Sequence, residues 1–315
     1  MNPLILTLFS LSLLLGTTIT ISSFHWLLAW AGLELSTLTI IPLISKQHHP
    51  RATEAATKYF LTQAAASSLI IFACLLNAWK TGQWNISQLT LPEATTTLTI
   101  AIAMKLGLAP LHFWLPEALQ GSTLPIALII STWQKLAPTL LLYMTINNLD
   151  KTTLITLGLL SSILGGWMGL NHTQTRKIMA FSSIAHMGWL FTAIALNPGL
   201  TLLTISIYLL LTSAMFSTLM MTSSKTLLDL GTTWPQSPTL LTTTLLTLMS
   251  LGGLPPLTGF IPKLLILKEL ITTNLFIIST LLALSTLPSL FFYLRMSYLT
   301  TLTLPPNTIN SKHLW

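Results

Sequence analysis

The stretch Leu251-Gly-Gly-Leu-Pro-Pro-Leu-Thr-Gly-Phe-Ile-Pro-Lys263 lies inside a long apolar segment, and it decides the fold. Proline removes a helical N–H donor and clashes with a carbonyl one turn earlier, while glycine permits the dihedral angles that follow a break. The stretch therefore predicts a helix that breaks within a membrane. Backbone groups freed at that depth are tolerated only where they face protein or trapped water, so we expect a polar cavity near Lys263.

A second stretch has the same character. Leu106-Gly-Leu-Ala-Pro-Leu-His-Phe-Trp114 follows directly on Lys105. The two breaks fall in apolar segments that are five segments apart, which is typical of transporters built from inverted five-helix repeats. We therefore expect a single membrane domain with a first repeat at 1–150, a second at 151–300 and a tail at 301–315. Ordinary proline kinks are the alternative, and they explain two matched breaks beside lysines less well.

The composition predicts an integral membrane protein. Of the 315 residues, 52% are hydrophobic and 7% are charged, against roughly 25% charged residues in soluble domains. The apolar runs leave no room for a water-soluble catalytic domain, so we predict an all-α, polytopic membrane helix bundle of about ten transmembrane helices. The expected spans are residues 3–22, 25–45, 55–79, 95–111, 122–145, 152–170, 178–197, 200–221, 238–271 and 274–299.

The loop charges predict the orientation. Basic residues in short loops concentrate on the side from which a membrane chain is inserted. With ten spans, the face that holds both termini carries eight Lys or Arg and three acidic residues, whereas the other face carries three of each. We therefore expect both termini on the inner side, which is the matrix side if the chain is mitochondrial. This asymmetry explains why basic residues outnumber acidic ones. Nucleic-acid binding, which needs a basic patch facing solvent, is not required to explain it.

The absence of valine indicates where the gene lies. The chain contains no valine at all, although valine is among the commonest residues of proteins. The codons for valine, glycine, aspartate and glutamate all begin with guanine, so their scarcity suggests a guanine-poor strand, as in animal mitochondrial genomes. We therefore expect a multi-pass protein of the mitochondrial inner membrane.

Four ionisable residues lie near the middle of apolar segments, namely Glu34, Lys105, Lys135 and Lys263. Each costs roughly 2.5 to 3.5 kcal/mol at a bilayer centre. Buried acids and amines beside a wet path are typical of proton relays, so we predict a proton pathway. We expect Glu34 to pair with Lys105 or Lys135, and a static ion pair that only packs helices is the alternative.

Two histidines are candidate relay elements. His112 follows Lys105 by seven residues, and His186 lies in the seventh span beside serine hydroxyls; core histidines with no relay role fit equally well. The lone cysteine, Cys74, cannot form a disulfide within the chain or ligate an iron–sulfur cluster, which needs several thiols. We expect this chain to bind no cofactor and no metal.

The chain resembles the vertebrate mitochondrial NADH-ubiquinone oxidoreductase chain 2 family. The resemblance covers essentially the whole chain and rests on Met104–Glu117, Gln174–Lys177, Ser182–Trp189 and Leu251–Lys263. Members are antiporter-like subunits in the membrane arm of respiratory complex I, related to cation/proton antiporters. The resemblance implies proton translocation coupled to quinone reduction elsewhere in an H⁺-translocating NADH:ubiquinone reductase. Members usually continue for one more membrane helix beyond the point where this chain ends.

The resemblance also implies roles for single residues. It makes Glu34 the coupling glutamate, Lys105 its partner, Lys135 the central relay lysine and Lys263 the lysine that governs exchange with the outer side. It places NADH, FMN, iron–sulfur clusters and ubiquinone in partner subunits, and it implies other membrane-arm and accessory subunits as partners. We also expect contact with phospholipid, with cardiolipin as a candidate. A freestanding monovalent cation/proton antiporter and an inert scaffold are the alternative functions.

Overall fold

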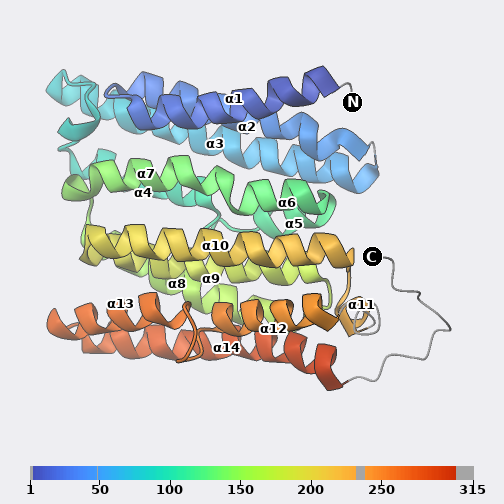
Figure 1. Ribbon diagram of the computed structural model, residues 1–315. Coiled ribbons are helices and arrows are strands. Elements are labelled where there is room, and N and C mark those ends of the chain that lie inside the picture. The colour runs from blue at the N-terminus through green and yellow to red at the C-terminus, as the bar shows by residue number, and fades with distance from the viewer. Residues whose placement is uncertain (1–2, 48, 232–237, 303–315) are drawn as a thin grey trace.

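The chain is a bundle of helices that run side by side, as the computed structural model shows in Figure 1. The structure describes residues 3–47, 49–231 and 238–302, and within these ranges it contains no β-strand. The helices are α1 (Pro3–Ser22), α2 (Trp26–Ile44), α3 (Pro50–Thr81), α4 (Pro92–Leu106), α5 (Trp114–Gly121), α6 (Leu124–Ser131), α7 (Trp133–Thr145), α8 (Lys151–Gly169), α9 (Thr175–Leu196), α10 (Pro198–Thr222), α11 (Leu227–Gly231), α12 (Pro238–Gly252), α13 (Phe260–Thr272) and α14 (Phe276–Leu302).

The predicted bundle of about ten transmembrane helices is confirmed for the described residues. Eight segments are long and apolar enough to cross a membrane, and one of them joins α6 and α7. Two further crossings are made by paired shorter helices, α4 with α5 and α12 with α13 (Figure 1). The division into repeats at 150 and 151 stays a prediction, and residues 303–315 of the predicted tail lie outside the described residues.

Both predicted helix breaks are present. Helix α4 is followed directly by Gly107, which has φ +74°, and the chain passes through 108–113 before α5 begins. Helix α12 is followed directly by Gly253, which has φ +82°, and α13 begins at Phe260. Glycine is the residue that adopts this left-handed conformation without a steric cost. The expected span 95–111 ends inside this break, and the chain resumes as a helix at Trp114 in α5.

A third interruption lies between α6 and α7, inside the span expected at 122–145. Thr132 there has φ −113° and ψ −69°. Its hydroxyl donates to the Leu128 carbonyl at 2.7 Å, and such back-bonding competes with the helical ladder and bends helices. The Lys135 N–H consequently donates to the Thr132 carbonyl at 3.2 Å. In a regular helix this N–H would bind the carbonyl of Ser131. That carbonyl therefore lacks its usual backbone donor.

Close packing of α9 against α8 fixes the middle of the bundle. A methyl group added at Gly188 would lie 2.6 Å from the Gly158 carbonyl oxygen, and one at Gly165 would lie 2.7 Å from the Ala185 nitrogen. Small residues that let backbones approach are typical of membrane helix interfaces. Helix α9, which carries His186, is therefore held rigidly between its neighbours.

Candidate functional site

The three predicted lysines all point into the protein. Lys105 on α4, Lys135 on α7 and Lys263 on α13 are 6%, 4% and 8% exposed, so none of them faces lipid. Glu34 on α2 is half-buried, and its Oε2 atom is enclosed. The predicted charges therefore lie in the interior, where each needs polar neighbours or water.

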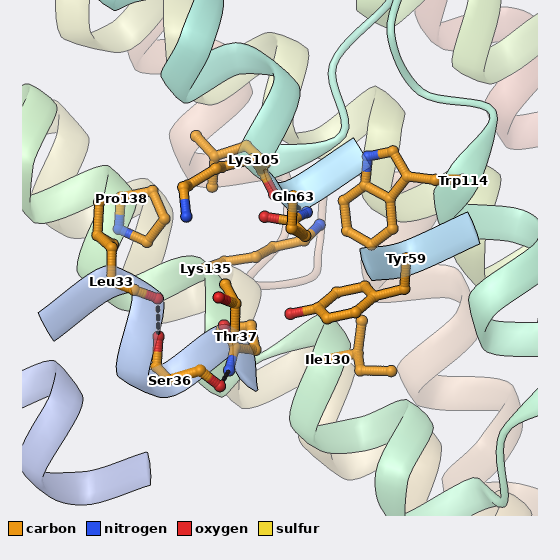
Figure 2. A pocket seen from close by; sticks show the side chains of 12 residues that line it. Leu33, Ser36, Thr37, Tyr59, Gln63, Lys105, Trp114, Ile130, Lys135 and Pro138 are labelled. Atoms are coloured by element: carbon orange, nitrogen blue, oxygen red, sulfur yellow. Dashed lines mark hydrogen bonds between the residues drawn. The ribbon is translucent and has the colours of Figure 1, made fainter. Parts of the chain in front are cut away.

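Lys105 and Lys135 share one small cavity, which we call the first cavity (Figure 2). Its volume is about 10 Å³, which is about the space that one water molecule needs. Figure 2 shows the two lysine side chains and Gln63 converging on it. Its other polar lining residues are Ser36, Thr37, Tyr59 and Gln134. The first helix break thus has the polar cavity that the sequence predicts beside it.

The break itself is stabilised by side chains. Gln63 on α3 donates through Nε2 to the Lys105 carbonyl at 3.4 Å, and the Trp114 indole donates to the Met104 carbonyl at 3.1 Å. The Lys105 ammonium has no hydrogen-bond partner among the described residues. A buried amine in that situation needs water or a transient partner, which suits a group that exchanges protons.

Glu34 is not ion-paired with either predicted partner. The ion pairs between described residues lie elsewhere, where Lys58 binds Glu54 and Glu117 and Lys80 binds Glu93. Leu33 and Thr37, which flank Glu34 on α2, line the first cavity together with the two lysines, so Glu34 lies beside that cavity without contacting either amine. Glu34 is nevertheless close enough to attract the charge of Lys105 through space, so an electrostatic coupling remains without a contact pair.

Lys135 contacts a residue that the sequence did not single out. Its Nζ donates to the hydroxyl of Tyr208 on α10 at 3.1 Å and lies 5.1 Å from the centre of that ring. The same hydroxyl donates to the Ser131 carbonyl at 2.9 Å, which is the carbonyl freed at the interruption between α6 and α7. The available signal was that Tyr208 is the one tyrosine in the span expected at 200–221.

Lys263 binds the backbone at the second helix break. Its Nζ donates to the carbonyl of Gly252 at 3.0 Å. A methyl group added at Gly253 would lie 2.8 Å from that Nζ, so the glycine leaves the space that the amine fills. The carbonyl freed by the break is thus a hydrogen-bond acceptor for the lysine.

A second cavity lies beside Lys263. We define it by His186, Tyr208 and Lys263, which line it with several apolar residues. Its volume is about 30 Å³, enough for about two water molecules. The centre of the His186 ring lies 5.8 Å from that of Tyr208, and its Nε2 lies 3.4 Å from the Tyr293 hydroxyl. His186 therefore lies near Tyr208, which binds Lys135, in the cavity that Lys263 also lines.

His112 lies apart from this row. It is 1% exposed, its Nε2 is 3.0 Å from the Met168 sulfur, and its ring stacks on Phe113. It lines a separate cleft of about 270 Å³ together with Glu117 and Lys177. The irregular backbone of the break turns the chain, so a spacing of seven residues from Lys105 does not place both side chains on one helical face. A relay role for His112 stays a prediction.

Family models match nearly all of the chain. The model described as "NADH:quinone oxidoreductase/Mrp antiporter, TM" matches residues 23–288, and "NADH dehydrogenase subunit 2 C-terminus" matches 290–315. NADH-ubiquinone oxidoreductase chain 2 of Struthio camelus is 56% identical over all of this chain and 91% of the relative. The protein of that name from Aquarana catesbeiana is also 56% identical, with the same coverage.

Solved structures share the fold. A chain of respiratory complex I from Thermus thermophilus, solved with bound aureothin, superposes with a TM-score of 0.85 at 28% identity, over 93% of this chain and 70% of that one. A chain of the Mrp complex from Dietzia sp. DQ12-45-1b gives a TM-score of 0.83 at 18% identity, over 95% of this chain and 61% of that one. The second likeness shows the fold alone.

Proposed function

Since the chain belongs to the NADH-ubiquinone oxidoreductase chain 2 family, we propose that it is the membrane subunit of a respiratory complex I in which protons cross along Lys105, Lys135 and Lys263. Quinone reduction elsewhere in the complex drives the transfer. The chain is thus a subunit of an H⁺-translocating NADH:ubiquinone reductase, and its own residues bind, hold and release protons.

One observation carries this proposal. Lys105 and Lys135 line one cavity, and Tyr208 connects Lys135 to the second cavity, which Lys263 lines. The three amines therefore form a continuous row inside the protein. Because like charges repel strongly where water is scarce, a proton arriving on one amine favours release from the next.

Glu34 has the coupling role in this proposal. It lies on α2 at the edge of the row and attracts the charge of Lys105 without contacting it. A change in the position or protonation of Glu34 therefore changes how firmly Lys105 holds its proton. His186, which lines the second cavity with Tyr208 and Lys263, is the proposed relay element of that cavity.

The redox chemistry belongs to partner subunits in this proposal. A single cysteine, buried at position 74, is too few to ligate an iron–sulfur cluster. NADH, FMN, the clusters and ubiquinone would therefore be bound by other chains of the complex. Those chains, together with accessory subunits, are the proposed protein partners.

The proposed location is the mitochondrial inner membrane with the termini on the matrix side. The absence of valine and the excess of basic loop residues on one face support it. Arg51 and Lys58 on α3 line a single cleft with Lys177 on α9, so basic residues from two distant parts of the chain lie close together. Figure 1 places the α5–α6 turn and α11 at the same end of the bundle as the start of α1.

Phospholipid is a further proposed partner, with cardiolipin as a candidate. A groove of about 490 Å³ between α1 and α6 has apolar walls that include Leu13 and Ile126, and Lys46 lies at its edge. This arrangement fits an acyl chain with an anionic headgroup.

Lys46→Ala should lower the anionic phospholipid retained by the purified complex about twofold, measured by lipid mass spectrometry. The outer-face control Lys151→Ala should not, and equal retention in both would contradict the proposal.

The proton pathway is tested by Lys105→Met in the assembled complex. Methionine matches the length of the lysine and cannot carry a proton, so the rate of NADH-driven proton uptake into sealed vesicles should fall about tenfold. Lys80→Met, the same change at an exposed ion pair, is the control. Uptake equal to that of the control would contradict the pathway. Uptake that needs Na⁺ and no NADH would instead favour the freestanding antiporter.

A further inference from the structure

We propose that the hydroxyl of Tyr208 is a two-position proton link between the first cavity and the second cavity. The inference deepens the proposed function and rests on it. It adds a residue that hands the proton from Lys135 toward Lys263, where Lys135 of the first cavity binds Tyr208 of the second cavity.

The position of Tyr208 supports the link. Its side chain is 5% exposed, its hydroxyl receives a hydrogen bond from Lys135 Nζ at 3.1 Å, and the residue lines the cavity of Lys263 and His186. The His186 and Tyr208 rings are 5.8 Å apart. Lys135 lines the first cavity, so a proton that leaves it toward the second cavity meets this hydroxyl first.

The interruption between α6 and α7 provides the resting position of the link. The Ser131 carbonyl accepts the Tyr208 proton at 2.9 Å. The Lys135 N–H, which would bind that carbonyl in a regular helix, donates to Thr132 instead. The Ser131 carbonyl therefore accepts from Tyr208 without this competing backbone donor.

A hydroxyl has one proton to donate, and this makes the link switchable. In the present structure the hydroxyl donates its proton in a hydrogen bond to the Ser131 carbonyl, so toward Lys135 the oxygen only accepts and no proton is directed into the second cavity. Rotation about the C–O bond turns the proton toward the second cavity instead. The structure therefore represents the closed position.

The transfer balances without an oxidant or reductant. An N–H bond of the Lys135 ammonium breaks and a new O–H bond forms on Tyr208, while the original O–H bond of Tyr208 breaks. The released proton goes to the neutral imidazole of His186 or to a water molecule in the second cavity. Lys135 ends as a neutral amine, and Tyr208 ends as it began.

Tyr208→Phe tests the link because it removes the hydroxyl and keeps the ring under Lys135. We expect the initial rate of NADH-driven proton uptake, normalised to assembled complex, to fall at least about tenfold. NADH oxidation by an artificial electron acceptor, which needs only the redox partners, should be unchanged. Tyr298→Phe, at an exposed tyrosine in α14, is the matched control and should pump as the unmodified complex does.

A double variant distinguishes a role of Tyr208 in proton transfer from a role in packing. If Lys135 and Tyr208 act in one step, Lys135→Met/Tyr208→Phe should be no slower than Lys135→Met alone. Normal uptake per assembled complex in Tyr208→Phe, with uptake blocked in Lys135→Met, would overturn the link and leave the proposed function standing. Normal uptake in both single variants would overturn the link and the proposed function together. A loss in Tyr208→Phe explained wholly by less assembled complex would also overturn the link.

Discussion

Replacing Lys135 by methionine should lower the initial rate of NADH-driven proton uptake about 100-fold or more. Lys135 has the central place in the row, because it lines the first cavity and donates to Tyr208, which borders the second. Methionine cannot accept or release a proton, so transfer between the cavities stops. The remaining amines stay in place but are no longer connected.

The Lys135→Met variant should still fold and assemble. Methionine has a similar length and fills irregular apolar space, and removing a buried amine removes its desolvation cost. Tyr208 keeps its hydrogen bond to the Ser131 carbonyl, so no buried donor is newly left unpaired. The measurement is proton uptake in sealed vesicles beside artificial-acceptor activity, with the exposed Lys80→Met as control. Uptake within twofold of that control would show that Lys135 is not in the pathway.

The second large effect on proton uptake is expected from replacing Lys263. Lys263→Met should also lower proton uptake about 100-fold, because it removes the amine that borders the second cavity. It leaves the freed Gly252 carbonyl without its donor, which costs roughly 1–3 kcal/mol of folding free energy. A modest loss of thermal stability should therefore accompany the loss of pumping.

Gly253→Ala tests the position of the Lys263 amine separately from its charge. It keeps every ionisable group, but its methyl group would lie 2.8 Å from Lys263 Nζ and displace the amine from the Gly252 carbonyl. We expect proton uptake to fall about fivefold, less than for Lys263→Met, because a displaced lysine still titrates. Gly82→Ala is the matched control, since Gly82 also has a positive φ, of +69°, but has open space around its Cα. If both alanine variants lose uptake equally, backbone strain rather than the position of Lys263 is responsible.

The breaks and the buried charges could be predicted from the sequence because their signals are local. Gly107 and Gly253, with the prolines that follow them, mark the helix ends, and both adopt the positive φ that such positions need. A lysine in an apolar span is equally conspicuous, and all three predicted lysines are interior. Helix starts were less precise: α3, α4 and α10 begin on the proline itself, before the expected starts at 55, 95 and 200, because the missing N–H of proline costs nothing there. Helix α12 begins at 238, as expected.

The connections between the lysines could not be predicted, because they depend on tertiary contacts. The interruption at Thr132 carries no glycine or proline, and Tyr208 reaches Ser131 from 77 positions away in the chain. Two predictions from position along the chain were also wrong. Glu34 forms no ion pair with Lys105 or Lys135, although all three were expected at a similar depth, and His112 lines another cleft because the irregular backbone of the first break turns the chain. Neither arrangement is encoded in local sequence.

The most direct measurement is an experimental map of the assembled complex at a resolution that shows ordered water. A hydrated row predicts water in the first cavity between Lys105 and Lys135 and in the second cavity between Tyr208 and Lys263, with Tyr208 bonded to both Lys135 and Ser131. Dry cavities, with these amines turned toward lipid or toward separate surfaces, would contradict a proton pathway through this chain.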